Sequence, residues 1–419
     1  MDLKASAERL CGEVNLPSSK SAAHRAVIAA ALAQGQSRID NVTMCDDIVA
    51  TIGAVGALGC TVSVDGDCVT VKGITAPQKT ALIDCKESGS TARFMIPIAA
   101  AYGTNATFIG SGRLPQRPLD DIISALSCSG ISFKKTTESY LPLEICGTID
   151  NGPIYIAGNV SSQYLTGLLF ACAVKGGSVE LTTALESAAY VDMTCDMLKA
   201  FGAEVKVDGN KYTLNGKLQA QTLSVEGDWS AAAFFFEAAA LGGKLKLFGL
   251  DPHSRQADRA CVDVFASMGV DIDFSGDSYI LSRKGVLKAT DMDASQCPDL
   301  VPAVAVAMAF AEGTSTIYNA GRLRIKESDR LKAVANGLLA LGINTDLYDD
   351  RLVIYGGKGH GGEIDSCNDH RIAMAFACAA GAVQGDITIK GADSVSKSYP
   401  QFFEVFKSIG GKTDVISNR

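Results

Sequence analysis

Several residues and motifs that mark particular classes of protein are scarce or absent in this chain. Its 419 residues include one tryptophan and four histidines. The thirteen cysteines are scattered, with no Cys-x-x-Cys pair and no Cys/His spacing typical of a zinc site. Gly-x-Ser-x-Gly and the glycine spacings of nucleotide-binding loops are missing too. We therefore expect reduced thiols, no metal site and no cofactor.

Long apolar runs and an excess of positive charge are also missing. The most apolar segment, AAAFFFEAAALGG at 231–243, is shorter than a membrane span and is interrupted by Glu237. The first residues lack the long apolar core of a signal peptide. A net charge of −8 argues against broad nucleic-acid binding. The sequence therefore predicts a cytoplasmic globular protein with neither a membrane nor a nucleic-acid partner.

What the chain does contain is a long-range repeat. An apolar helical stretch ends at a glycine, and two alternating strand-like runs around a turn follow it, as in ALGCTVSVDGDCVTVKG at 57–73. The marker glycines are separated by 71, 72, 67, 73 and 68 residues, so that six repeats fill the chain. These glycines are Gly59, Gly130, Gly202, Gly269, Gly342 and Gly410.

Each repeat is predicted to be mixed α/β, with about two helices and several short strands. Six repeats favour two domains of three, and a restarted helical pattern in DWSAAAFFFEAAALGG places a boundary near Gly227. The first 16 residues resemble a strand that has no partner before the first helix. We therefore expect them to cross over to the C-terminal half.

Several apolar helices are predicted to begin in polar or cationic loops. In LPSSKSAAHR, serines typical of an N-cap precede Lys20, Ser21 and Arg25, which places free backbone N–H groups beside two cations. Such a helix start suits a phosphate or a carboxylate. Each motif alone is equally typical of an ordinary capped helix in solvent. The candidate starts lie at Lys20, Gly89, Ser161, Asp299, Lys326, Arg371 and Lys397.

The segment RLRIKESDR at 322–330 contains four cations and two carboxylates. As the start of a helix, it would place Lys326 and Arg330 on one face, with Glu327 close to Arg330. A carboxylate among cations stays ionised, and it can move a proton while its neighbours bind anionic groups. The segment favours an electropositive site for an acidic substrate, although a solvated helix start would explain it as well.

The chain resembles the 5-enolpyruvylshikimate-3-phosphate synthase family over essentially its full length. The resemblance rests on segments that occur in the family's order, namely LPSSKSAAHR, SGSTAR, QRP, SSQ, CPD, RIKESDR, NDHR and SKSYP. It implies an α/β fold of two similar domains, each with three βαβαββ-like repeats, described as an inside-out α/β barrel. The implied N-terminal domain is 17–227, the C-terminal domain is 1–16 plus 228–419, and the active site lies in the cleft between them.

The resemblance also implies an activity. The family transfers the enolpyruvyl group of phosphoenolpyruvate to the 5-hydroxyl of shikimate-3-phosphate and releases phosphate, in aromatic amino acid biosynthesis. Both substrates are small acids that carry a phosphate and a carboxylate, which would give the clustered cations their purpose. A monomer without a metal or a cofactor is expected.

The site residues implied by the resemblance fall into two sets. The shikimate-3-phosphate set is Lys20, Ser21, Arg25, Ser161, Ser162, Gln163, Ser187, Tyr190, Asp299, Arg322 and Lys326. The phosphoenolpyruvate set is Lys20, Gly89, Arg117, Gln163, Arg330, Arg371 and Lys397. Asp299 would accept the proton of the attacking hydroxyl. Glu327, with Lys20, would protonate the methylene carbon and later remove a proton from it.

Two positions depart from the family pattern. Glu87 stands where an asparagine is expected before SGSTAR, and an acid there would repel phosphoenolpyruvate unless it points away or pairs with Arg93. Arg322 stands where some members have a substrate-binding asparagine. Gly89 keeps the small side chain that leaves room for the inhibitor glyphosate in this family, so we expect sensitivity to it.

Two other functions remain open at this point. The sister enzyme, UDP-N-acetylglucosamine enolpyruvyl transferase, has the same repeats, but it typically has Lys-Asn where this chain has Lys20-Ser21. It often has a cysteine in the loop that reads GSGRLPQRP here. A non-catalytic anion-binding protein would keep the cations but would not need Asp299 or Glu327.

Overall fold

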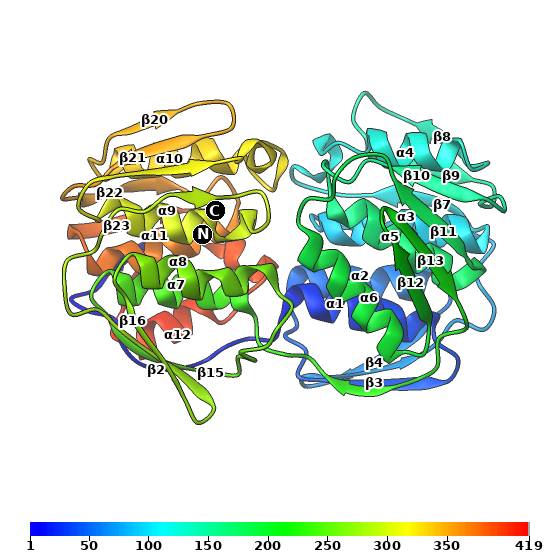
Figure 1. Ribbon diagram of the computed structural model, residues 1–419, viewed down its shortest axis with the longest axis horizontal. Helices are drawn as coiled ribbons and strands as arrows, with labels where there is room; N and C mark the ends of the chain where they lie inside the picture. Colours follow the sequence, from blue (N-terminus) through cyan, green and yellow to red (C-terminus); the bar gives the residue numbers. More distant parts are fainter. Residues whose placement is uncertain (418–419) are drawn as a thin grey trace. The chain divides into compact units, whose positions relative to one another are not determined.

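The computed structural model describes residues 1–417 and divides the chain into two compact units (Figure 1). The N-terminal unit is Ser18–Glu226, and the C-terminal unit is Met1–Pro17 together with Gly227–Arg419. These limits differ by one residue at each end from the domains implied by the resemblance. No helix in the described part of the chain has an apolar stretch long enough to cross a membrane.

The N-terminal unit contains three four-stranded sheets, ordered β14-β3-β5-β4, β6-β7-β9-β8 and β10-β11-β13-β12. Its strands are β3 (Gln36–Asp40), β4 (Thr61–Asp65), β5 (Cys68–Lys72), β6 (Thr80–Asp84), β7 (Asn105–Ile109), β8 (Ser132–Lys135), β9 (Leu143–Cys146), β10 (Pro153–Ile156), β11 (Gly177–Leu181), β12 (Glu204–Asp208), β13 (Lys211–Asn215) and β14 (Thr222–Ser224). Its helices are α1 (Lys20–Leu32), α2 (Asp46–Ala57), α3 (Gly89–Tyr102), α4 (Asp120–Ser127), α5 (Ser162–Lys175) and α6 (Ala188–Ala200), with a 3₁₀ turn η1 (Leu114–Gln116).

The C-terminal unit repeats this plan with sheets ordered β16-β17-β15-β2, β18-β19-β21-β20 and β22-β23-β1-β24. Its strands are β1 (Asp2–Ser6), β2 (Cys11–Asn15), β15 (Lys244–Phe248), β16 (Asp271–Ser275), β17 (Ser278–Ser282), β18 (Met292–Asp293), β19 (Thr314–Tyr318), β20 (Thr345–Leu347), β21 (Leu352–Tyr355), β22 (His360–Asp365), β23 (Gln384–Lys390) and β24 (Lys412–Ser417). Its helices are α7 (Trp229–Ala240), α8 (Cys261–Ser267), α9 (Val301–Ala309), α10 (Arg330–Ala340), α11 (His370–Cys378) and α12 (Phe402–Ser408). The 3₁₀ turns are η2 (Ala257–Ala260), η3 (Pro298–Leu300), η4 (Gly321–Ile325), η5 (Ala379–Gly381) and η6 (Ala392–Lys397).

One strand pattern underlies all six sheets. In the repeat that starts at β6, strands β6 and β7 run parallel, and an antiparallel hairpin of β8 and β9 pairs onto β7. The helix α3 connects the parallel pair, and α4 leads into the hairpin. The predicted mixed α/β fold of six βαβαββ-like repeats is confirmed, and the marker glycines explain where the second helix of each repeat ends. All six have φ between 82° and 109°, a backbone conformation open mainly to glycine.

The N-terminal segment supplies strands to sheets formed late in the sequence. β2 lies parallel to β15, with Val14 opposite Leu247. β1 lies between β23 and β24 and is antiparallel to both. Alternating burial of Leu3 and Ala5 drives this pairing, because an isolated strand leaves its apolar face and its backbone groups exposed.

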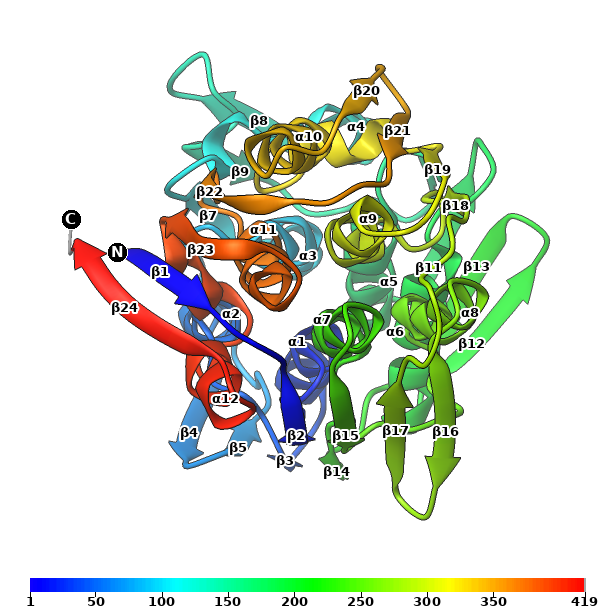
Figure 2. The same cartoon turned by 90° about the vertical axis from the view of Figure 1, so that its left-hand side faces the viewer.

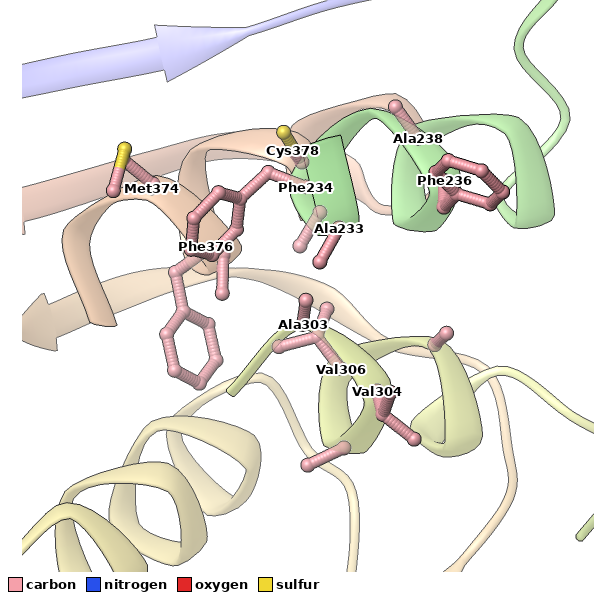
Figure 3. Packing of buried hydrophobic residues seen from close by; sticks show 14 of the residues in the cluster. Ala233, Phe234, Phe236, Ala238, Ala303, Val304, Val306, Met374, Phe376 and Cys378 are labelled. Atoms are coloured by element: carbon pink, nitrogen blue, oxygen red, sulfur yellow. The ribbon is translucent and has the colours of Figure 1, made fainter. Parts of the chain in front are cut away.

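The core of the C-terminal unit is made of the first helices of its three repeats, α7, α9 and α11, which pack against one another inside the sheets (Figure 2). Every residue of α9, VPAVAVAMA, is buried, and an apolar helix of this kind is stable only when it is surrounded. Figure 3 shows Phe234 and Phe376 from α7 and α11 close to Ala303 of α9. In the N-terminal unit, α3 and α5 pack together in the same way.

The repeat also positions polar residues. Each sheet contains one parallel pair of strands whose carboxyl ends meet at one edge, where ligands of α/β proteins commonly bind. The candidate site residues lie in the segments that follow these strands. Gly89 follows β6, Ser161 follows β10, Asp299 follows β18 and Arg371 follows β22.

One buried acid in α7 is not satisfied by its surroundings. Glu237 is fully buried, and neither of its carboxylate oxygens has a hydrogen-bond partner. Burial raises the pKa of Glu237 well above its usual value. Burial raises the pKa of the Cys378 thiol on α11, and the charge of an ionised Glu237 would raise it further.

We expect Glu237→Leu to stabilise the protein by about 1–3 kcal/mol at pH 8, because a buried polar group without partners is costly. A native pKa above the unfolded value of about 4.3 means that the carboxyl group costs least below that pH and destabilises as the pH rises. The gain should therefore shrink towards pH 5, as measured by urea unfolding at both pH values. Glu237→Gln is the control: it should lose the pH dependence while keeping a buried polar group. A variant as pH-sensitive as the wild type would contradict this account.

Candidate functional site

The start of α1 presents the first candidate cation. Ser19 caps the helix by accepting a hydrogen bond from the backbone N–H of Ala22. The Nζ atom of Lys20 lies 2.7 Å from Oδ2 of Asp47 at the start of α2, and both side chains are largely buried. Sequence reasoning missed Asp47. The only available signal was the Asp46–Asp47 pair ahead of an apolar helical run.

Arg25 is bound by protein groups on every side. It donates to Thr194 Oγ1 and to the carbonyl oxygens of Ser21 and Tyr190, each at 2.8 Å. Its guanidinium is buried 5.5 Å from the ring centre of Phe94, and burial lowers the pKa of Arg25 to about 10. Arg25 thus ties together α1 and α6, the helices that carry Ser21 and Tyr190.

The start of α3 brings Gly89 against Arg117. A methyl group added at Gly89 would lie 2.5 Å from Nη1 and 2.8 Å from Cζ of Arg117, so only glycine allows the observed contact. The carboxylate of Glu87 lies beside Gly112, where an added methyl group would come within 2.3 Å of it. Glu87 therefore packs on the loop that follows β7.

Gln163 is held by hydrogen bonds at both ends of its amide. Its Oε1 accepts from Nη1 of Arg93 at 2.8 Å, and its Nε2 donates to the hydroxyl of Ser90 at 3.0 Å. Arg93 also donates to the carbonyl oxygen of Pro118, next to Arg117. Arg93 therefore orients Gln163 and the 117–118 segment together.

The other candidates of the N-terminal unit lie at two further helix starts. Ser161 caps α5, with Ser162 as its first residue. Ser187 precedes α6 with φ 54° and is buried. A left-handed serine is strained, and such residues are concentrated at functional sites.

In the C-terminal unit, three cations surround the carboxylate of Asp299. Its Oδ1 is 2.8 Å from Nη1 of Arg330 and 3.5 Å from Nζ of Lys326. Its Oδ2 is 3.1 Å from Nη2 of Arg371. Burial alone would raise the pKa of Asp299, but the three cations outweigh it and hold the pKa well below its usual value.

Arg330 is the centre of this cluster. It is almost completely buried, and it also contacts Glu327 at 2.7 Å and Asp369 at 2.9 Å. Burial alone would lower the pKa of Arg330, but Asp369, Glu327 and Asp299 outweigh burial and raise it. Asp369 is fully buried, caps α11 and accepts from Ser328 as well. It stood in the NDHR segment, but its role as the partner of Arg330 was not predicted.

The expected helix at 322–330 is wrong. Residues Gly321–Ile325 form the 3₁₀ turn η4, Lys326 is extended, and α10 begins only at Arg330, after the N-cap Asp329. Lys326 and Arg330 nevertheless meet at Asp299, because that carboxylate, rather than helical spacing, gathers them. Arg322 lies apart from this contact and donates to the carbonyl oxygen of Ser295 at 2.6 Å.

Lys397 does not begin a helix either. It is the last residue of η6, and α12 begins at Phe402. Its Nζ donates to the carbonyl oxygen of Asn368 at 2.5 Å, just ahead of α11. Cys367 and Asn368 both have positive φ, 52° and 55°, which turns that carbonyl towards the lysine segment. Lys397 is thereby held beside the start of the helix that carries Arg371.

A second buried acid lies near Asp299. Asp258 in η2 accepts a hydrogen bond from the hydroxyl of Ser230, while its Oδ1 has no partner. Burial raises the pKa of Asp258 to about 6, and the charge of Asp299 adds to that shift. Within residues 1–417, no group of three or more His, Cys, Asp or Glu side chains is arranged to hold a metal ion.

Two units of three repeats, with cations and acids at the carboxyl ends of their parallel strands, define the fold of the enolpyruvyl transferases. An EPSP synthase from Acinetobacter baumannii has a similar structure, with a TM-score of 0.82 at 28% identity over 99% of this chain and 100% of that one. The enolpyruvyl transferase NikO from Streptomyces tendae shares the fold at 19% identity, with a TM-score of 0.79 over 99% and 98% of the two chains.

Sequence relatives make the class more specific. The 3-phosphoshikimate 1-carboxyvinyltransferase of Clostridium novyi is 41% identical, and the match covers 99% of this chain and 98% of the relative. That of Clostridium acetobutylicum is 42% identical and covers 96% of each chain. The family model of EPSP synthase (3-phosphoshikimate 1-carboxyvinyltransferase) matches residues 4–406. The chain belongs to the EPSP synthase family, as the sequence motifs predicted.

Proposed function

We propose that this protein transfers the enolpyruvyl group of phosphoenolpyruvate to the 5-hydroxyl of shikimate-3-phosphate, with release of inorganic phosphate. The observation that carries the proposal is the Asp299 cluster, in which one carboxylate is held by Lys326, Arg330 and Arg371 in a chain of the EPSP synthase family. Such a cluster offers both cations for acidic substrates and a base for a hydroxyl proton.

The proposed binding groups fall into one set for each substrate. Shikimate-3-phosphate is assigned to Lys20, Ser21, Arg25, Ser161, Ser162, Gln163, Ser187, Tyr190, Asp299, Arg322 and Lys326. Phosphoenolpyruvate is assigned to Lys20, Gly89, Arg117, Gln163, Arg330, Arg371 and Lys397. Arg25 also donates to the hydroxyl of Thr194 and to the carbonyl oxygens of Ser21 and Tyr190, so it would help to position Ser21 and Tyr190 as well.

The reaction needs two proton transfers. The hydroxyl oxygen bonds to C2 of phosphoenolpyruvate while its proton passes to Asp299, and a proton from Glu327 converts the methylene carbon into a methyl group. Loss of a methyl proton and cleavage of the C2–O bond to phosphate then restore the double bond. Fixed cations around the phosphate and carboxylate stabilise the tetrahedral adduct.

The low pKa of Asp299 has a consequence for this scheme. A strongly depressed pKa makes a weak base, and the free protein holds Asp299 in that state through its three cations. Anionic substrates that bind Arg371 and Lys326 would partly neutralise the positive charge that lowers the pKa of Asp299. Substrate binding should therefore raise the pKa of Asp299 and prepare it to accept the hydroxyl proton.

The proposal is tested by measuring phosphate release from the purified protein with phosphoenolpyruvate and shikimate-3-phosphate. Turnover should require both substrates. UDP-N-acetylglucosamine in place of shikimate-3-phosphate should give none, and turnover with it would favour the sister enzyme. Binding of both acids without phosphate release would favour a non-catalytic protein. We also expect a monomer, which sedimentation analysis can check, and a cytoplasmic location, which cell fractionation can check.

Gly89→Ala is expected to raise the KM for phosphoenolpyruvate by about 10- to 100-fold, the loss of one charge-assisted contact. The added methyl group would overlap Arg117 and push its guanidinium aside. The KM for shikimate-3-phosphate should stay unchanged, and inhibition by glyphosate, which competes for the space beside Gly89, should weaken.

Gly152→Ala is the matched control for this variant. A methyl group at Gly152 would meet nothing within 4 Å, and the residue lies in the same unit. If Gly89→Ala and Gly152→Ala bound phosphoenolpyruvate equally well, Arg117 would not be the group that holds it.

A further inference from the structure

Side chains from three helices form a buried hydrogen-bond chain in the N-terminal unit. Nδ1 of His24 in α1 lies 2.7 Å from the hydroxyl of Thr51 in α2, which lies 2.7 Å from the hydroxyl of Thr91 in α3. Thr91 donates to the hydroxyl of Ser88, the N-cap of α3, at 2.8 Å. None of the four residues is more than 1% exposed. Thr51, Thr91 and Ser88 form the hydroxyl chain.

The direction of the hydrogen bonds follows from the number of hydrogens. Thr91 has one hydroxyl hydrogen and gives it to Ser88, so Thr51 must donate to Thr91. Thr51 then has no hydrogen left, and Nδ1–H of His24 must donate to it. This direction fixes the neutral Nδ1–H tautomer and leaves Nε2 as a bare nitrogen, which is buried and has no hydrogen-bond partner. Burial lowers the pKa of His24 well below its usual value, and Lys20 and Arg25 lower it further.

The hydroxyl chain ends where α3 begins. Ser88 also accepts from the backbone N–H of Thr91, so its hydroxyl oxygen sets the geometry of the first turn. Gly89 is the first residue of that turn, and it lies so close to Arg117 that an added methyl group would come within 2.5 Å of Nη1. A small rotation at Ser88 would therefore change the distance between Gly89 and the guanidinium.

Stability alone does not call for such a chain. Apolar side chains of the same shape are often as stable in a core as a buried hydrogen-bonded set. What hydrogen bonds add is a defined position, because each has a preferred length and angle. Three helices that meet through apolar contacts alone could shift by fractions of an ångström, whereas the hydroxyl chain fixes their positions relative to one another.

We propose that His24, acting through the hydroxyl chain, is a positioning residue that holds Gly89 at the distance from Arg117 that phosphoenolpyruvate binding requires. This inference rests on the proposed function for the identity of the ligand. It assigns His24 no contact with substrate and no proton transfer.

The test compares variants that break or keep the donor at the head of the chain. His24→Leu and Thr51→Val should each raise the KM for phosphoenolpyruvate by about tenfold, with kcat and the KM for shikimate-3-phosphate within twofold of wild type. His24→Asn, whose amide N–H can replace Nδ1–H, should bind phosphoenolpyruvate like the wild type. Equal changes in both KM values, or no rescue by asparagine, would overturn the proposal.

Thr104→Val is the matched control. Thr104 is buried just beyond the C-terminal end of α3 and donates to the carbonyl oxygen of Gln78 at 2.7 Å. The variant loses a buried threonine hydroxyl at the other end of the same helix. It should lower stability without changing either KM, and a phosphoenolpyruvate effect as large as that of Thr51→Val would show that general loosening of α3 is the cause.

Two readouts do not depend on turnover. The nitrogen NMR shifts of His24 should report the neutral Nδ1–H tautomer in the wild type, and an Nε2–H tautomer would overturn the proposal. Amide exchange at Thr91 should become faster in Thr51→Val but not in Thr104→Val. If the wild type does not turn over the two substrates, the proposed function fails, while these measurements still support or overturn the positioning of α3 by His24.

Discussion

Asp299→Asn is expected to lower kcat by about 10²- to 10⁴-fold, the usual contribution of a positioned general base. Asparagine has nearly the same shape, and its one amide oxygen can accept from either Arg330 or Arg371. Arg371 also keeps its hydrogen bond to the backbone carbonyl oxygen of residue 299, so the fold should persist. What it lacks is the ability to take the hydroxyl proton. Steady-state kinetics with both substrates, together with circular dichroism and thermal unfolding, would measure the two effects separately.

Separate effects on kcat and on KM distinguish a role of Asp299 in proton transfer from a role in holding the arginines. If Asp299 served only to hold the arginines, its loss would appear mainly as a higher KM for phosphoenolpyruvate, with kcat nearly intact. Asp277→Asn, at an exposed hairpin position of the same unit, is the control and should change neither constant. An Asp299→Asn enzyme with a normal kcat would remove the proposed base from the mechanism.

Glu327→Gln tests the second proton transfer in the same way. Protonation of the methylene carbon in D₂O, followed by loss of a methyl proton, should leave deuterium in the product of the wild type. Glutamine keeps a hydrogen-bond acceptor for Arg330 but has no proton to give, so turnover and deuterium incorporation should fall together. Wild-type incorporation in this variant would assign the transfer to another group, with Lys20 the first candidate.

Arg330→Leu is expected to destabilise the C-terminal unit by about 3–5 kcal/mol, which is typical when one partner of a buried ion pair is removed. Its guanidinium is almost completely buried between Asp299, Glu327 and the fully buried Asp369. Leucine would leave Asp369 ionised in the interior, with Ser328 and a backbone N–H as its remaining donors. Urea unfolding at pH 7 would measure the loss.

The pH dependence of this loss has a defined sign. Asp299 has a native pKa below its unfolded value of about 3.9, so its contribution is fully present above that pH and is lost as the pH falls towards the native pKa. The gap between wild type and Arg330→Leu should therefore be full at pH 7 and narrow below pH 4. Arg330→Lys keeps the charge but not the planar fork, and it should fall between the two.

An exposed ion pair provides the comparison. Lys4 and Asp386 lie 2.6 Å apart with about half of each side chain in water. Lys4→Met should leave the unfolding transition where it is, since solvent already screens that pair. If Arg330→Leu were as harmless as Lys4→Met, the cluster around Arg330 would not be a buried network at all.

Much of the architecture could be predicted because it depends on local chemistry that recurs. A glycine at the end of each second helix and an alternating hairpin after it are visible in any one repeat, and five matching intervals make them a pattern. The positive φ of all six marker glycines explains why that residue type returns. The pairing of the first 16 residues with the C-terminal half could also be predicted, because a strand without a neighbour leaves its backbone groups unpaired.

Less of the candidate site could be predicted from the sequence. The residue types could be predicted from helix starts that gather cations, but their partners could not. Asp47 and Lys20 are separated by 27 residues, and Asp299 and Arg371 by 72. Nothing local indicates which carboxylate meets which guanidinium. The helix expected at 322–330 was wrong for a related reason: Lys326 and Arg330 bind Asp299, and a contact with a distant residue is not visible in the local sequence.

The sequence by itself determined the repeat, the apolar helices that fill the core, and the inventory of cations and acids at the ends of parallel strands. These follow from backbone geometry and hydrophobic burial, which act over a few residues at a time. Only the tertiary structure decided that Arg330 is shared by three acids, that Gly89 touches Arg117, and that His24 reaches the cap of α3 through two threonines. Such contacts depend on distances between segments far apart in the chain, and those distances exist only after the core has packed.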